Sequence, residues 1–205
     1  MESRSLLEKR RALIIAVSEY NNPLQHLPFC KNDGEEMYEV LKSLGYQIPH
    51  NNKLVGQVKG NQIKDAIYDF FGDETINSQD TILFYYSGHG IPDIDGDVYL
   101  ASSEINPKQP YRNGFSFSEL TKMMNRSLST RVVAILDCCY GGAAKVGKGN
   151  EDDAAKIGTF FQNFFQKNLH CLTKGKENVF YLQVKRHKRR MERRKEITAF
   201  LLFIY

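Results

Sequence analysis

The sequence predicts an α/β domain with a mainly parallel sheet flanked by helices. Three apolar runs, 11–20, 80–90 and 131–137, are almost unbroken, which is typical of strands that are buried on both faces. Segments with helical periodicity separate these runs, and alternating strands and helices favour parallel pairing. The 205 residues suit one domain with a sizeable core.

The first half of the chain is expected to hold one strand and two helices. RALIIAVSEY (11–20) is an apolar run that ends at turn residues. Apolar residues recur at helical spacing in 33–45, where we expect Asp33 as the N-cap and Gly45 as the stop. The segment 61–71 repeats the helical pattern.

The second half begins with DTILFYYSGHG (80–90), a strand that we expect to end in a Gly-His-Gly turn. Residues 91–114 are polar, contain three prolines and are expected to form a loop. The segment 115–127 has helical spacing, with Ser116 or Ser118 as the N-cap. RVVAILD then forms the third strand.

Composition indicates a soluble protein that keeps its thiols reduced. Hydrophobic residues make up 41% of the chain and charged residues 25%, which is ordinary for a globular protein. No segment resembles a signal peptide, and no apolar run approaches the roughly 18–20 residues that span a bilayer. Neighbouring cysteines without a secretory context favour the cytoplasm over a disulfide framework. We therefore expect a cytoplasmic protein with no membrane partner.

Two expected strand ends present an imidazole and a thiol. SGHG contains His89, and ILDCCYGG places Cys138 and Cys139 between Asp137 and two glycines. The carboxyl ends of parallel strands meet at one edge of a sheet, where ligands bind. A histidine beside a cysteine lowers the thiol pKa and protonates the leaving amine. Either residue alone is more often structural, but the combination favours nucleophilic catalysis.

FYYSGHG, followed fifty residues later by DCCYGG, resembles the caspase-like cysteine peptidases (peptidase family C14, clan CD), in their metacaspase and prokaryotic branch. The resemblance covers about residues 10–157 and implies a caspase-like fold. It implies Cys139 as the nucleophile and His89 as the general acid and base. It also implies an oxyanion hole from the backbone N–H groups of Gly90 and Cys139. The substrates would be proteins or peptides, and the dyad needs no organic cofactor.

The resemblance also implies a substrate pocket for the P1 side chain. Metacaspases hold Arg or Lys with acids, and Cys30 and Asp33 match their Cys-x-x-Asp motif. Asp137 would supply the second acid and Ser87 the pocket serine. An acidic pair favours a cationic side chain through charge-assisted hydrogen bonds. We therefore expect cleavage after Arg or Lys rather than after Asp.

An acidic stretch offers weak calcium candidates. Asp93, Asp95 and Asp97 alternate around Gly96, and oxygen ligands at such spacing suit calcium. The stretch lacks the bidentate acid of an EF-hand, so a solvated acidic loop is the favoured interpretation. We assign no metal site and keep calcium open only as an activator.

A phosphate-binding loop is the competing motif. Residues 142–149 match the spacing G-x-x-x-x-G-K, which would indicate an NTPase. Gly149 stands where a Ser or Thr must bind magnesium, and an acidic run follows instead of an apolar helix. As a peptidase the chain would use this segment as a linker between its large and small subunits, with Lys145 or Lys148 as autocleavage sites.

The motifs divide the chain into an N-terminal extension (1–10), a catalytic large-subunit domain (11–157) and an aberrant C-terminal segment (158–205). The last segment lacks the expected small-subunit pattern, and alternate-frame codons for parts of it encode peptides of that type. We hypothesise a frameshift that removes two strands and exposes an edge strand.

The basic run 185–195, with eight Lys or Arg, would otherwise indicate a nucleic-acid patch. A frameshift makes the run accidental, so no nucleic-acid partner is expected. The alternative function is a catalytically inactive caspase-like module that binds partners because its small subunit is lost. The sequence predicts no particular oligomeric state.

Overall fold

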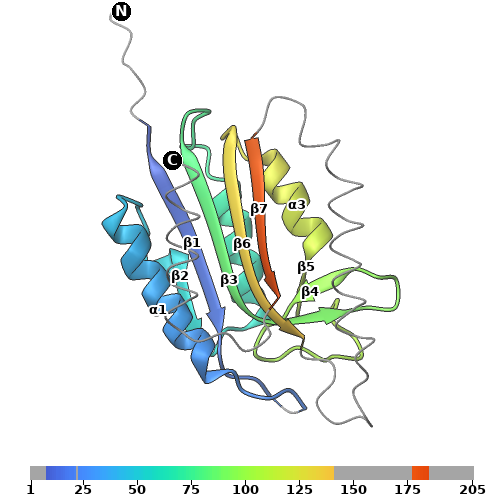
Figure 1. Ribbon diagram of the computed structural model, residues 1–205. Coiled ribbons are helices and arrows are strands. Elements are labelled where there is room, and N and C mark those ends of the chain that lie inside the picture. The colour runs from blue at the N-terminus through green and yellow to red at the C-terminus, as the bar shows by residue number, and fades with distance from the viewer. Residues whose placement is uncertain (1–7, 22, 141–176, 185–205) are drawn as a thin grey trace, which may run out of the picture.

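Figure 1 shows the computed structural model, which describes residues 8–21, 23–140 and 177–184. In this part of the chain, strands β2, β1, β3, β6 and β7 lie side by side and pair in parallel. Strands β4 and β5 extend the sheet with antiparallel pairs. The strands are β1 (Arg10–Val17), β2 (Lys53–Gly56), β3 (Thr81–Pro92), β4 (Val98–Leu100), β5 (Phe115–Ser116), β6 (Arg131–Tyr140) and β7 (Glu177–Val184).

Helices cover both faces of the sheet, with α1 on one side and α2 and α3 on the other (Figure 1). These elements are α1 (Pro28–Ser43), α2 (Gly60–Phe71), α3 (Phe117–Arg126) and the short 3-10 helix His50–Asn52. The arrangement confirms the predicted α/β class. No helix in the described part is long and apolar enough to cross a membrane.

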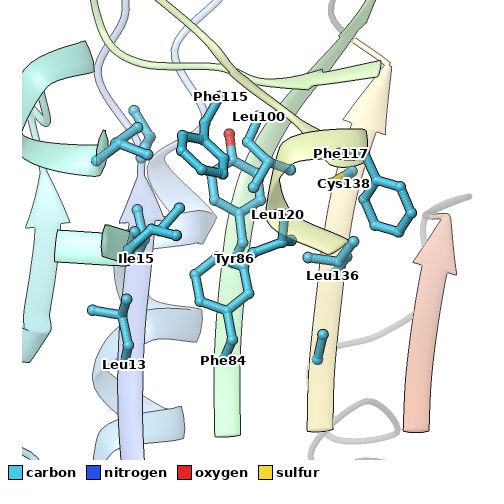
Figure 2. Packing of buried hydrophobic residues seen from close by; sticks show 14 of the residues in the cluster. Leu13, Ile15, Phe84, Tyr86, Leu100, Phe115, Phe117, Leu120, Leu136 and Cys138 are labelled. Atoms are coloured by element: carbon cyan, nitrogen blue, oxygen red, sulfur yellow. The ribbon is translucent and has the colours of Figure 1, made fainter. Parts of the chain in front are cut away.

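Successive side chains of each central strand enter different core clusters. In β1, Leu13 and Ile15 pack with α2 and α3 in the larger cluster (Figure 2), whereas Ile14 packs with α1 in the smaller one. Because both faces are covered, the apolar runs show no polar alternation. Each fully buried aliphatic side chain contributes about 1.5–3 kcal/mol to stability.

The expected helix ends are partly wrong. Helix α1 begins at Pro28 rather than at Asp33, because a proline in the first turn has a preset φ and needs no hydrogen-bond acceptor. Asp33 is therefore not the N-cap. Gly45 does end the helix, with a φ of 82° that favours glycine. Ser116 caps α3 as predicted, since its Oγ accepts the N–H of Glu119 at 3.1 Å.

The predicted Gly-His-Gly turn and the loop after it are corrected by the structure. β3 continues as a strand to Pro92 and does not turn at Gly88–Gly90. It then forms a hairpin with β4, in which Gly90 pairs with Leu100. The β3–β4 ladder keeps the backbone extended beyond Gly90, where the apolar run 80–90 ends.

The segment 158–205, which was expected to lack the small-subunit strands, contains one strand in the described part of the structure, β7. β7 pairs with β6 in parallel from Arg131 and Glu177 to Cys138 and Val184. Its sequence, ENVFYLQV, has the β-branched and aromatic content of a strand. The linker with Lys145 and Lys148, the phosphate-loop match 142–149 and the basic run 185–195 lie outside the described residues.

Candidate active site

His89 lies where β3 changes its neighbour. β1 pairs with β3 only as far as Ala16 and Ser87, and β4 pairs with β3 from Gly90 onward. On the other side of β3, His89 shares its register position with Cys139 of β6. Neighbouring strands are about 4.8 Å apart. The backbones of the two predicted catalytic residues are therefore adjacent.

The His89 imidazole is buried, with 4% of the residue exposed. Its Nε2 lies 2.9 Å from the backbone carbonyl oxygen of Gln25. A carbonyl can only accept a hydrogen bond, so Nε2 carries a proton. Nδ1 is then the ring nitrogen that can take a proton from a thiol.

Two tyrosines hold the backbone of His89. The hydroxyl of Tyr20 accepts the His89 N–H at 2.9 Å, and its ring lies 4.6 Å from the imidazole between centroids. The hydroxyl of Tyr86 contacts the carbonyl oxygens of His89 at 2.9 Å and Ala101 at 3.0 Å. Burial is the main cause that raises the pKa of both tyrosines, so their hydroxyls stay protonated.

Two of the predicted pocket residues, Ser87 and Asp137, lie side by side in the sheet. Ser87 and Asp137 share a register position on β3 and β6, and both are buried. Burial raises the pKa of Tyr85 well above its ordinary value. The charges of Asp137 and Asp33 raise this pKa further. The electrostatic environment of this buried hydroxyl therefore includes acids from α1 and β6.

Tyr85 is a site residue that sequence reasoning missed. It precedes Ser87 by two positions on β3, so the period of a strand places both side chains on one face. That spacing was the available signal, but an aromatic residue inside an apolar run resembles ordinary core.

The two adjacent cysteines differ in surroundings. Cys138 is 5% exposed and packs in the larger core cluster with Leu136 and Phe117 (Figure 2). Such a buried thiol behaves as a small hydrophobe. The side chain of Cys139 lies outside the described part of the structure.

The acidic stretch closes the β3–β4 hairpin. Oδ1 of Asp93 accepts the backbone N–H groups of Asp95 at 3.0 Å and Asp97 at 2.9 Å. Oδ1 of Asp97 accepts the N–H of Val98. Burial, followed by the charges of Asp93 and Asp97, raises the pKa of Tyr99 to about 12. Across the described residues, no three His, Cys, Asp or Glu side chains are arranged for a metal ion.

Residues 9–204 match the family model described as Caspase domain, in peptidase family C14. The chain belongs to the caspase-domain family. The match runs past residue 157, where the sequence motifs alone end the resemblance. Membership agrees with the cysteine and histidine at the carboxyl end of the sheet and supports cysteine peptidase chemistry in broad terms.

Solved structures resemble this caspase domain in fold. Protein GSU0716 from Geobacter sulfurreducens aligns with a TM-score of 0.51 and 16% identity, covering 85% of this chain and 71% of that one. The structure of pro-Sf-caspase-1 aligns with a TM-score of 0.49 and 14% identity, covering 71% of this chain and 53% of that one. The caspase domain thus spans about half the length of that pro-caspase. No curated protein matches.

Proposed function

We propose that this caspase domain is a cysteine endopeptidase of the metacaspase and prokaryotic branch, with Cys139 as the nucleophile and His89 as the general acid and base. The observation that carries the proposal is the shared register position of these residues on β3 and β6. The burial of Cys138 in the core supports Cys139 as the reactive cysteine of the pair.

The reaction is acyl transfer through a thioester. Nδ1 of His89 takes the thiol proton, and the thiolate of Cys139 attacks the scissile carbonyl carbon. His89 then returns the proton to the leaving amine as the C–N bond breaks. Water hydrolyses the thioester, with His89 taking its proton. The Gln25 carbonyl, 2.9 Å from Nε2, stabilises the imidazolium that forms in each step.

The developing oxyanion would be held by the backbone N–H groups of Gly90 and Cys139. Gly90 directly follows His89 on β3, and its neighbour across the sheet is Tyr140, directly after Cys139. A pair of backbone donors at the oxyanion contributes about 2.7–4 kcal/mol per donor to transition-state stabilisation.

The proposed specificity is for Arg or Lys at P1. Asp137 lies beside Ser87 in the β3–β6 register, and the charges of Asp137 and Asp33 both raise the pKa of Tyr85, which supports an acidic pocket. Two nearby carboxylates favour a cationic ligand and disfavour the carboxylate of an Asp substrate. Cys30 lies in the first turn of α1 and is buried.

Proteins or peptides are the proposed substrates, in the cytoplasm, and the dyad needs no organic cofactor. Calcium is proposed only as an activator that acts outside the dyad. The β3–β4 hairpin is the place to test it, because Asp93 there combines a carboxylate with a fixed loop geometry.

The testing experiment compares peptides that end in Arg, Lys or Asp before a fluorogenic leaving group, with calcium and with a chelator. Cleavage of the Arg and Lys peptides supports the peptidase and its acidic pocket, and cleavage of the Asp peptide contradicts the pocket. If this chain cleaves no peptide but a chain with a restored reading frame does, the C-terminal segment impairs the enzyme. If neither chain cleaves a peptide, the partner-binding module is favoured.

A further inference from the structure

We propose that Tyr20 is a positioning residue for His89, an inference that rests on the peptidase function proposed above. Tyr20 follows β1, at the point where this strand stops pairing with β3. Its hydroxyl and its ring contact two different parts of His89. Tyr20 therefore fixes both the backbone and the ring plane of the proposed general base.

The hydroxyl of Tyr20 replaces a missing strand neighbour. The β1–β3 ladder ends at Ser87, so it supplies no acceptor for the buried N–H of His89. The Tyr20 hydroxyl accepts this N–H at 2.9 Å, and the Tyr86 hydroxyl donates to the carbonyl of the same residue at 2.9 Å. Leaving a buried N–H without an acceptor is costly, so this path of β3 depends on Tyr20.

The ring of Tyr20 restricts the imidazole. The ring centroids are 4.6 Å apart with an interplanar angle of 53°. The Gln25 carbonyl holds Nε2, so ring and carbonyl together define the imidazole plane and its proton-bearing nitrogen. The aromatic face also stabilises the protonated ring. Both effects favour a base that stays aligned while it gains and loses a proton.

Tyr20 is itself firmly held. It is almost fully buried, and its backbone N–H donates to Nδ1 of His26 at 3.2 Å. The next N–H, of Asn21, donates to the carbonyl of Ser103 at 2.7 Å. These two hydrogen bonds fix the backbone of Tyr20 and so the position of the side chain that contacts His89.

Gly88 makes the arrangement sterically feasible. A Cβ at this position would lie 2.5 Å from the Tyr86 hydroxyl and 2.7 Å from the Tyr20 hydroxyl. Both distances are shorter than any ordinary contact, so the two hydroxyls occupy the space that a side chain would need. Gly88, the first glycine of SGHG, therefore leaves space for the hydroxyls of Tyr20 and Tyr86.

The experiment uses the full chain and separates hydroxyl from ring with Tyr20→Phe and Tyr20→Leu. Tyr46→Phe is the matched control, because Tyr46 is equally buried but belongs to the other core cluster. Turnover of the Arg peptide gives kcat and KM. NMR titration of the His89 imidazole, identified by its loss in His89→Gln, reports on the base without requiring turnover.

We expect Tyr20→Phe to lower kcat about 10- to 100-fold through misalignment, with KM changed less than about twofold. Its titration midpoint stays near that of the wild type because the ring remains. Tyr20→Leu also lowers the midpoint of His89 by about 0.5 pH unit, since the aromatic face is lost. Among the side chains that the structure describes, the other titratable groups around the pair are His26, Cys30, Tyr86 and Cys138, and they are the same in all variants, as is Cys139.

An unchanged kcat in Tyr20→Phe, or a loss that Tyr46→Phe reproduces, would overturn the inference. If neither this chain nor one with a restored reading frame cleaves a peptide, the proposed function fails and the titration decides alone. If the titration midpoint of His89 in Tyr20→Leu equals that of the wild type, the positioning role is refuted. If the midpoint is lowered in Tyr20→Leu but not in Tyr20→Phe, the positioning role is supported.

Discussion

His89 and Cys139 occupy the same register position on the neighbouring parallel strands β3 and β6. β1 stops pairing with β3 just before His89, and the β3–β4 ladder begins just after it. The proposed catalytic positions thus lie where β3 changes its neighbour from β1 to β4, and the loop residues Gln25 and Tyr20 contact His89 there. Catalytic residues often lie where loops meet a rigid scaffold in this way.

Gly88→Ala is expected to lower the free energy of unfolding by about 1–3 kcal/mol, because its Cβ overlaps two hydroxyls. Gly90→Ala is the matched control, since its Cβ would have its nearest neighbours at 3.5 Å, an ordinary contact. Urea denaturation of both variants measures the difference. Equal stability of the two variants would show that the tyrosine pair does not constrain position 88.

Asp137→Asn is expected to lower kcat/KM for an Arg peptide by about 100-fold, because a buried charge no longer meets the cationic side chain. Cleavage of an otherwise identical Gln peptide should change far less. The ratio of the two kcat/KM values separates lost specificity from lost folding. The exposed Asp65 on α2 offers a control, Asp65→Asn, which should leave the ratio unchanged. Equal losses for both peptides would exclude Asp137 from the pocket.

Arg11 and Asp73 form an ion pair at 2.8 Å near the start of β1. A hydrogen bond from the Thr75 side chain, and then its backbone N–H and the Arg11 charge, lower the pKa of Asp73 against the opposing effect of burial. The unfolded chain therefore binds its proton more tightly. The stabilisation by Asp73 is present above about pH 4 and is lost as the pH falls through the folded-state pKa.

Asp73→Asn is accordingly expected to lower the free energy of unfolding at pH 7 by about 0.5–1 kcal/mol, a small value because solvent screens a side chain that is 37% exposed. The difference from the wild type should shrink in urea denaturation between about pH 5 and pH 2. Asp69→Asn, on exposed α2 surface, should change stability by less than about 0.5 kcal/mol. A difference that stays constant with pH would contradict the role of the ionised Asp73.

The central strands could be predicted because burial on both faces leaves a readable apolar run, as in β1 and β3. β2 was missed because Lys53–Gly56 is too short for a pattern, and only its pairing with β1 makes it a strand. β4 was missed because the turn before it depends on the Asp93 carboxylate, which a polar composition does not reveal.

Site residues that belong to a sequence motif could be predicted, whereas residues that act only through tertiary contacts could not. His89 and Cys139 follow from glycine-flanked strand ends. Tyr20 and Tyr85 resemble core residues in the sequence. Their roles depend on where β1 stops beside β3 and on which face of β3 the pocket lies. Such tertiary relationships leave no local signature.

The most direct test of the dyad is covalent labelling by a peptide with a C-terminal arginyl chloromethyl ketone, followed by digestion and mass spectrometry. A Cys139–His89 dyad predicts one adduct, a thioether on Cys139 formed with loss of chloride, that is absent in His89→Gln and retained in Cys138→Ala. An adduct on Cys138 or Cys30, or labelling of Cys139 that does not depend on His89, would contradict it.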